Sequence, residues 1–91
     1  MNQLTAFQRD ILYAINKHGE PYGLTIKNEL ETYYDSEVNH GRLYPNLDEL
    51  ADRGFLVKSQ KDKRTNEYQL TDQAYDAMQK RRKWENIDDS H

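Results

Sequence analysis

Two groups of polar and basic side chains lie close together in this 91-residue sequence. The first combines amide, imidazole, guanidinium and phenol groups with one glycine, and its members are Asn39, His40, Gly41, Arg42, Tyr44 and Asn46. The second is basic and comprises Lys58, Lys61, Lys63 and Arg64. Amide and guanidinium groups can hydrogen-bond to base edges, and cationic side chains neutralise phosphates. Residues of these types in this order indicate a surface that binds duplex DNA.

The residues of the first group differ in how strongly they indicate contact with DNA. Arg42 is the best candidate, because its guanidinium can donate to two acceptors at once. For Asn39, His40 and Tyr44, structural roles are open alternatives, with Asn39 as a helix cap and Tyr44 as a ring at the edge of the core. For Asn46, a solvated surface amide is the favoured interpretation. The basic group also has an alternative, a solubilising turn, although its position beside the first group favours DNA binding.

The charge of the chain is unevenly distributed. Its net charge is −3, whereas non-specific nucleic-acid binders are commonly basic. Seven acids and one base lie between Glu29 and Asp52, but four bases and one acid lie between Lys58 and Arg64. Because salt screens charges beyond about 8 Å, local charge matters more than the net value. If the first group opens a helix, the rear of that helix (residues 48–52) is acidic, so only its front turns should approach phosphates.

The apolar periodicity predicts four helices and two strands. In chain order they are a helix at Ala6–Lys17, a helix at Tyr22–Tyr34, a helix capped by Asn39, strands at Phe55–Gln60 and Glu67–Leu70 joined by a loop at Lys61–Asn66, and a helix at Asp72–Glu85. Three short helices followed by a β-hairpin are typical of the winged helix-turn-helix fold. The expected class is therefore mainly α with a two-stranded β-wing (α+β), in the order helix-helix-helix-strand-strand-helix.

Local signals predict where these elements begin, end and face the core. Thr5 and Gln8 form a capping-box pattern, and Gly19 and Gly54 are expected helix terminators. Pro45, early in the third helix, should kink that helix or shift its start. The expected inner faces are Leu4, Phe7, Ile11 and Ile15 in the first helix, Leu24, Ile26, Leu30 and Tyr33 in the second, and Leu43, Leu47 and Leu50 in the third.

The chain is expected to form a winged helix-turn-helix domain over residues 1–71, followed by a dimerisation helix at residues 72–86 and a frayed tail at residues 87–91. Only 35% of its residues are hydrophobic, so the core is thin and shared apolar surface with a second copy is expected. The last helix has apolar residues on two faces, which indicates that it contacts its own core and a partner. The expected dimerisation residues are Tyr75, Met78 and Trp84.

Two stretches of the chain resemble the PadR family of transcriptional regulators. GRLYPNLDELADRGFL (Gly41–Leu56) is similar to the segment that opens the recognition helix in that family, and RTNEYQLT (Arg64–Thr71) is similar to its second wing strand. The resemblance implies a dimeric winged-helix repressor that dimerises through its C-terminal helix. In some small members an aromatic residue of that helix lines a ligand pocket, but for Trp84 a plain interface anchor is favoured. The chain departs from the family at Tyr22-Gly23, where the order Gly-Tyr is usual.

Together these features predict a homodimeric, sequence-specific DNA-binding regulator, a repressor that acts on a pseudo-palindromic operator in the cytoplasm. The alternative is a winged-helix module that binds a protein through its acidic face. No cofactor or metal is expected, because there is no cysteine and the three histidines lie far apart. No enzyme is expected either, since no nucleophile–base pair or phosphate-binding glycine loop accompanies the carboxylates. The expected partners are duplex DNA and a second copy, with no membrane; a small-molecule effector is left open.

Overall fold

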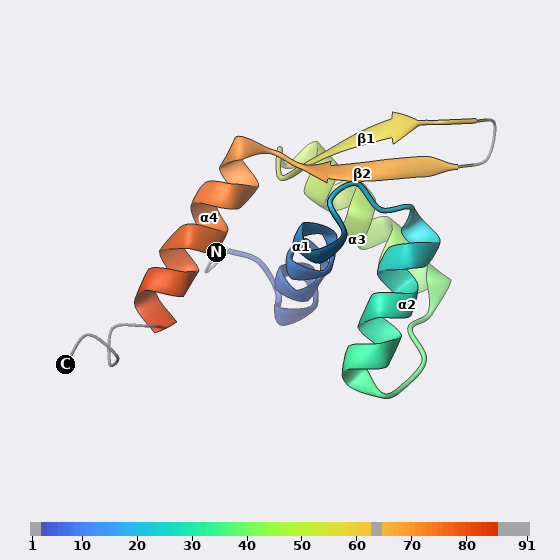
Figure 1. The fold of residues 1–91 in the computed structure, drawn as a ribbon, viewed down its shortest axis with the longest axis horizontal. Helices are drawn as coiled ribbons and strands as arrows, with labels where there is room; N and C mark the ends of the chain where they lie inside the picture. The colour runs from blue at the N-terminus through green and yellow to red at the C-terminus, as the bar shows by residue number, and fades with distance from the viewer. Residues whose placement is uncertain (1–2, 63–64, 86–91) are drawn as a thin grey trace.

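The computed structural model describes residues 3–62 and 65–85. Its elements are α1 (Ala6–His18), α2 (Gly23–Tyr34), α3 (His40–Asp52), β1 (Leu56–Gln60), β2 (Asn66–Leu70) and α4 (Asp72–Glu85). This order confirms the predicted winged helix-turn-helix arrangement, in which α2 and α3 form the helix-turn-helix and β1 and β2 form the wing. In Figure 1, α1 lies at the centre, with α4 on one side of it and α2 on the other. None of the helices in the described residues combines the length and apolar character of a bilayer-spanning segment.

The predicted boundaries of α1 are confirmed by hydrogen bonds at both ends. The Gln8 N–H donates to the Thr5 hydroxyl, and the Thr5 N–H donates to the Gln8 side-chain oxygen, each at 3.1 Å. At the other end, the Gly19 N–H donates to the Ile15 carbonyl at 2.9 Å. Gly19 has φ +84°, in the left-handed region that favours glycine. Local sequence therefore determines where this helix begins and ends.

The core lies where α1, α2, α3 and the inner side of the wing meet. The largest fully buried side chains are Tyr68, Ile11, Leu12, Ile15, Ile26, Leu30, Leu43, Leu47 and Leu50. The predicted inner faces of α1 and α3 are confirmed. The predicted face of α2 is wrong in two positions, because Leu24 is 57% exposed and Tyr33 is 75% exposed. Two residues along a helix correspond to a rotation of about 200°, so Leu24 points away from the buried Ile26. Tyr33 lines an open cleft at the C-terminal end of α2.

α3 begins at His40 and continues through Pro45 to Asp52. Of the two predicted effects of Pro45, the shifted start is wrong, since the helix already includes the residues before the proline, and the kink stays a prediction. Asn39 is the N-cap, as predicted, and its side chain accepts a hydrogen bond from the Gly41 N–H. The chain turns after α3 at Gly54, where φ is +88°. The Phe55 N–H then donates to the Leu50 carbonyl at 2.9 Å and closes the helix end.

β1 and β2 pair in antiparallel register, with Leu56 opposite Leu70 and Gln60 opposite Asn66. The connection between α1 and α2 is attached to this sheet, because the Tyr68 N–H donates to the Pro21 carbonyl at 2.9 Å. That bond holds the start of α2 against β2. At the other end of β2, Thr71 caps α4, accepting from the Ala74 N–H at 3.2 Å.

Candidate nucleic-acid interface

The outer side of α3 is defined by the residues opposite its buried leucines. Because Leu43, Leu47 and Leu50 face the core, the helix turns its opposite side to solvent. The exposed residues on that side are Gly41, Pro45, Asp48 and Asp52. These four residues form a line along α3. Its front half, Gly41 and Pro45, lacks long side chains, and its rear half, Asp48 and Asp52, is acidic. A duplex can therefore approach the front of α3 closely, with contacts supplied by the side chains that flank it.

One flank of the front is aromatic. The rings of His40 and Tyr44 stack, with centroids 5.3 Å apart and planes inclined by 6°. His40 is exposed, whereas Tyr44 is half-buried beneath the start of α2. Stacking gives the two side chains one shared orientation, so both face the same side of α3. The predicted positions of these residues at the leading end of α3 agree with this arrangement.

The other flank carries Arg42, which rests on α1. Its guanidinium carbon lies 3.8 Å from the centroid of the Phe7 ring. Phe7 in turn stacks on Tyr34, with ring centroids 6.4 Å apart. An arginine stacked on a ring keeps its N–H edges free for acceptors, so the stack orients the fork without consuming its donors. Burial, together with the nearby Asp10 carboxylate, raises the pKa of the Tyr34 hydroxyl, which donates to that carboxylate.

Asn46 is engaged within the protein. Its side-chain amide donates to the Arg42 carbonyl at 2.7 Å and accepts from the Gln8 side chain at 3.0 Å. Gln8 is 3% exposed and also donates to the Glu49 carboxylate. The solvated surface amide expected for Asn46 is therefore wrong, because both ends of the amide are bonded within the protein. These bonds also give Gln8 a role that the capping-box pattern did not indicate, since its amide joins α1 to α3.

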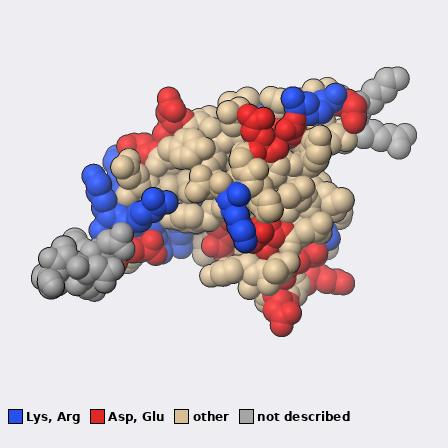
Figure 2. Space-filling model, viewed as in Figure 1, with Lys and Arg blue, Asp and Glu red and all other residues tan. Residues whose placement is uncertain are grey.

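The wing carries its cations in ion pairs. The Lys58 ammonium lies 3.1 Å from the Asp48 carboxylate of α3, and that of Lys61 lies 3.0 Å from the Glu67 carboxylate of β2. Figure 2 shows basic and acidic side chains side by side over the wing. Exposed pairs of this kind stabilise a protein by roughly 0–1 kcal/mol, so a phosphate can compete for either lysine. The other two predicted wing cations, Lys63 and Arg64, lie outside the described residues.

The turn between α2 and α3 is held by one carboxylate. Glu31 accepts from the Val38 N–H at 2.8 Å and pairs with Lys27 at 3.0 Å. The Val38 hydrogen bond and then the Lys27 contact hold the pKa of Glu31 below its ordinary value. Asp35 lies between Glu31 and Val38 in the sequence, and its φ of +56° is in the left-handed region. This clamp determines how the N-terminus of α3 is placed relative to α2.

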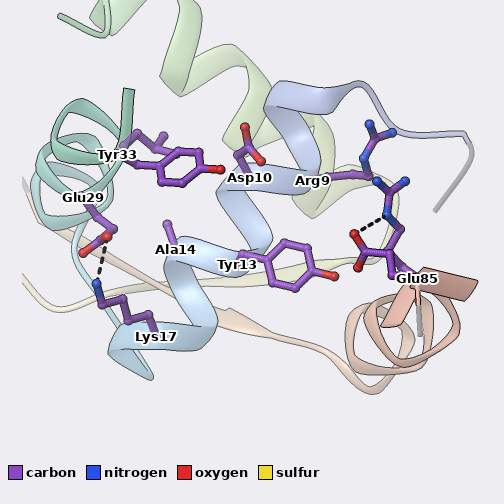
Figure 3. A pocket seen from close by; sticks show the side chains of 10 residues that line it. Arg9, Asp10, Tyr13, Ala14, Lys17, Glu29, Tyr33 and Glu85 are labelled. Carbon is purple, nitrogen blue, oxygen red and sulfur yellow. Dashed lines mark hydrogen bonds and ion pairs between the residues drawn. The ribbon is translucent and has the colours of Figure 1, made fainter. Parts of the chain in front are cut away.

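A separate cleft of about 510 Å³ lies between α1, α2 and the end of α4. Tyr13 and Tyr33 line it, and ion pairs join Lys17 to Glu29 at 3.1 Å and Arg81 to Glu85 at 3.6 Å (Figure 3). Contacts with His18 and then Lys17 hold the pKa of Glu29 below its ordinary value.

The expected dimerisation residues of α4 occupy two different environments. Met78 is 2% exposed and packs in the core of the chain itself, together with Ala74. Tyr75 is 50% exposed and Trp84 is 66% exposed. The Arg81 guanidinium carbon lies 5.2 Å from the centroid of the Trp84 ring, next to the cleft just described. Tyr75 and Trp84 are therefore the members of this set that are free to contact another molecule.

Comparison with known proteins identifies the family. The model of the transcriptional regulator PadR-like family matches residues 11–80. The structure of RosR from H. salinarum superimposes with a TM-score of 0.90 at 53% sequence identity, covering 93% of this chain and 76% of that one.

Two more distant structures share the fold. F93 from STIV, a winged-helix DNA-binding protein, has a TM-score of 0.76 at 17% identity, over 91% of this chain and 90% of that one. A transcriptional regulator from Clostridium thermocellum has a TM-score of 0.70 at 18% identity, over 96% and 93% of the two chains. None of the curated proteins matches the chain in sequence. The chain belongs to the PadR-like family of transcriptional regulators and is a winged-helix DNA-binding regulator.

Proposed function

We propose that the chain is a sequence-specific repressor that binds duplex DNA as a homodimer. The observation that carries the proposal is the front of α3, where a line without long side chains is flanked by the His40–Tyr44 stack and by Arg42. In the major groove, this front places the guanidinium of Arg42 where it can donate to the edge of a guanine. Gly41 allows the backbone to come close, and Asn39 and Asn46 hold the front turn in shape through their hydrogen bonds.

The wing is proposed to hold the DNA backbone beside the groove. Lys58 and Lys61 exchange their carboxylate partners for phosphates, which releases condensed counterions and makes binding depend on salt. Lys63 and Arg64 are proposed to act at the tip of the same hairpin. The wing thus supplies affinity that does not depend on sequence, and the front of α3 supplies discrimination between bases.

Dimerisation is proposed to use the exposed face of α4, with Tyr75 and Trp84 as anchors. Large exposed aromatic side chains are the residue types that contribute most to protein interfaces. A twofold dimer would present two recognition helices to half-sites about 34–36 Å apart, which predicts a pseudo-palindromic operator. A dimer on such a site would block transcription by occupying it, so repression requires no further domain. We place this activity in the cytoplasm, and we propose no catalytic role or cofactor.

The rival proposal is a module that binds a protein through the acidic rear of α3. The observation that favours it is the exposure of Asp48 and Asp52 on the outer side of that helix. Asp48 is paired with Lys58 at 3.1 Å, which lowers the net charge that this surface offers a partner. DNA binding therefore remains the stronger proposal.

The test is a titration of labelled duplex from upstream of the chain's own gene at several salt concentrations. Arg42→Ala should weaken binding about 10- to 100-fold, the range expected for loss of one base contact. Lys58→Ala should lower the slope of log affinity against log salt by about 0.9. Lys17→Ala, on the side of α1 that lines the cleft, is the control and should leave both quantities unchanged. Salt-independent or undetectable binding by the unaltered chain would favour the rival.

A further inference from the structure

A small cavity lies where the start of α2, the front of α3 and the half of β2 nearest the wing loop meet. Its volume is about 150 Å³, which is the volume of about five water molecules in the liquid. The lining residues are Tyr22, Gly23, Leu24, Tyr44, Thr65, Asn66 and Tyr68. Two of these elements, α3 and the wing, also contribute to the proposed DNA interface.

The start of α2 supplies hydrogen-bond donors to this cavity. The first N–H groups of a helix have no acceptor within the helix, and Tyr22, the N-cap, offers no side-chain hydrogen bond. The first turn of α2 also contains no acidic residue. The partial positive charge of this helix end is therefore not neutralised by its own side chains, and it is directed towards the cavity that Gly23 and Leu24 line.

The phenol of Tyr44 lies directly against this helix end. A Cβ on Gly23 would be 2.6 Å from the Tyr44 hydroxyl oxygen and 2.8 Å from its ring. Only glycine allows so close an approach. The absence of a side chain at residue 23 therefore lets the Tyr44 hydroxyl lie against the first residue of α2.

Tyr68 supplies the observation that is independent of the helix end. It is 1% exposed, and its hydroxyl has no hydrogen-bond partner among the residues that the structure describes. Yet no fully enclosed polar side-chain atom in that part of the chain lacks a partner. The hydroxyl must therefore reach the cavity that Tyr68 lines. Burial, and then the nearby Asp48, raise the pKa of Tyr68 to about 12, so at neutral pH the group is a donor.

We propose that this cavity binds one backbone phosphate of the DNA, held by the N–H groups of Leu24 and Thr25 and by the hydroxyls of Tyr44 and Tyr68. The inference rests on the proposed function and adds a phosphate site that the basic residues of the sequence did not indicate. Phosphate oxygens accept hydrogen bonds from every donor of the set. Asp48, whose charge helps to raise the pKa of Tyr68, is paired with Lys58 in the chain without DNA; when Lys58 moves to a phosphate, the four donors must outweigh the repulsion from this carboxylate.

The proposal gives Tyr68 a defined effect on one phosphate of each half-site. Tyr68→Phe removes the hydroxyl and keeps the ring, and it should weaken binding of the natural duplex about tenfold. Replacing single phosphates by uncharged methylphosphonates should weaken the unaltered chain at one position of each half-site. On the duplex altered at that position, Tyr68→Phe should cause no further loss, because the two changes remove the same bond.

Two controls separate the proposal from an effect on folding. Tyr13→Phe removes a hydroxyl in the cleft between α1 and α2 and should leave DNA affinity unchanged. Thermal unfolding of Tyr68→Phe should occur at the same or a higher temperature, because a buried hydroxyl without a partner does not stabilise the fold. A clear drop in unfolding temperature would overturn the proposal by assigning the hydroxyl an internal bond.

The remaining outcomes are also decisive. If the unaltered chain binds its duplex but Tyr68→Phe binds equally well, the phosphate site is wrong and the proposed function stands. If the unaltered chain binds no duplex, the proposed function fails first. A third outcome would be that inorganic phosphate shifts the amide resonances of Leu24 and Thr25, while every methylphosphonate duplex still loses affinity when Tyr68 is replaced by Phe. The cavity would then be a site for a free anion, and a DNA phosphate would be excluded.

Discussion

The guanidinium of Arg42 lies over the ring of Phe7, with its central carbon 3.8 Å from the ring centroid. The side chain proposed to read DNA is thus oriented by α1, an element that itself does not belong to the helix-turn-helix. Phe7 is fixed by the core and by Tyr34, so the position of the Arg42 fork is coupled to the packing of three helices. Orienting the fork before DNA arrives lowers the ordering cost of each base contact.

Phe7→Leu should therefore reduce base discrimination more than it reduces general DNA affinity. Leucine maintains most of the buried volume, at a cost of about 1–1.5 kcal/mol in unfolding free energy. It offers no ring for the guanidinium, so the Arg42 fork becomes mobile. The ratio of affinities for operator and unrelated duplex should fall by about three- to tenfold, a loss of the order of a cation–π contact. Competition titrations with both duplexes measure this ratio.

The matched comparison for this prediction is Arg42→Lys, which retains the charge and removes the planar fork. It should lower the same ratio while Phe7 is intact. An unchanged ratio in Phe7→Leu would show that the stack does not orient the reading side chain.

Gly23→Ala tests the close approach between α2 and α3. Alanine is ordinarily the better helix residue, by about 0.8–1 kcal/mol. Here its Cβ would meet the Tyr44 hydroxyl at 2.6 Å, so the ring must move. We expect a net destabilisation of about 1–3 kcal/mol, the usual cost of overpacking. Urea unfolding of Gly23→Ala, Tyr44→Leu and the double variant measures it.

The double variant decides whether the clash is the cause. Because leucine at position 44 removes the phenol, alanine at position 23 should then cost little or should stabilise α2. Equal effects of Gly23→Ala in both backgrounds would mean that its cost comes from the backbone alone.

The sequence predicted the features that depend on neighbours along the chain. The Thr5–Gln8 capping box, the Asn39 cap and the turn at Gly54 are confirmed because each needs only a few consecutive residues. The seam formed by residues 43, 47 and 50 is confirmed because helical periodicity alone places it on one face.

The facing of one apolar residue and the contacts between distant residues could not be predicted correctly from the sequence. Leu24 was assigned to the core because it is apolar, but its angle around α2 turns it outwards. The link from Gln8 to Asn46 joins residues far apart in sequence, and nothing local indicates it. Whether the Tyr68 hydroxyl finds a partner among the described residues depends on which acceptors the fold brings near, whereas the burial of Tyr68 follows from the strand pattern.

Glu31 should make stability depend on pH in the acidic range. Its folded-state pKa is held below the ordinary value of 4.5 by the Val38 N–H and then by Lys27. Contacts that lower a carboxyl pKa stabilise the folded protein above the ordinary value, and their contribution is lost as pH falls below it. The difference in unfolding free energy between the unaltered chain and Glu31→Gln should therefore shrink between about pH 6 and about pH 3.

Urea unfolding across that pH range measures the difference. Glu37→Gln, an exposed position in the same connection, is the matched control, because it removes a carboxylate without removing the hydrogen bond to the Val38 N–H. A constant difference for Glu31→Gln across the range would assign its effect to lost packing instead of lost charge.

Trp84 is expected to decide the oligomeric state. Its ring is 66% exposed on one chain, beside a cleft of about 510 Å³ and within 5.2 Å of the Arg81 guanidinium. Removing a buried aromatic anchor from an interface commonly costs 2 kcal/mol or more. Trp84→Ala should therefore raise the dimer dissociation constant about 30-fold or more, as measured by sedimentation equilibrium. Lys80→Ala, an exposed position on the same helix, should not change it.

The same variant separates dimerisation from DNA recognition. A Trp84→Ala monomer should keep the front of α3 and the wing, since the ring contact of Trp84 is with Arg81 of its own helix. It should bind an isolated half-site as the unaltered chain does, but it should lose the preference for two half-sites about one helical turn apart. If it retains that preference and the unaltered dissociation constant, the anchor lies elsewhere on α4, with Tyr75 as the next side chain to replace.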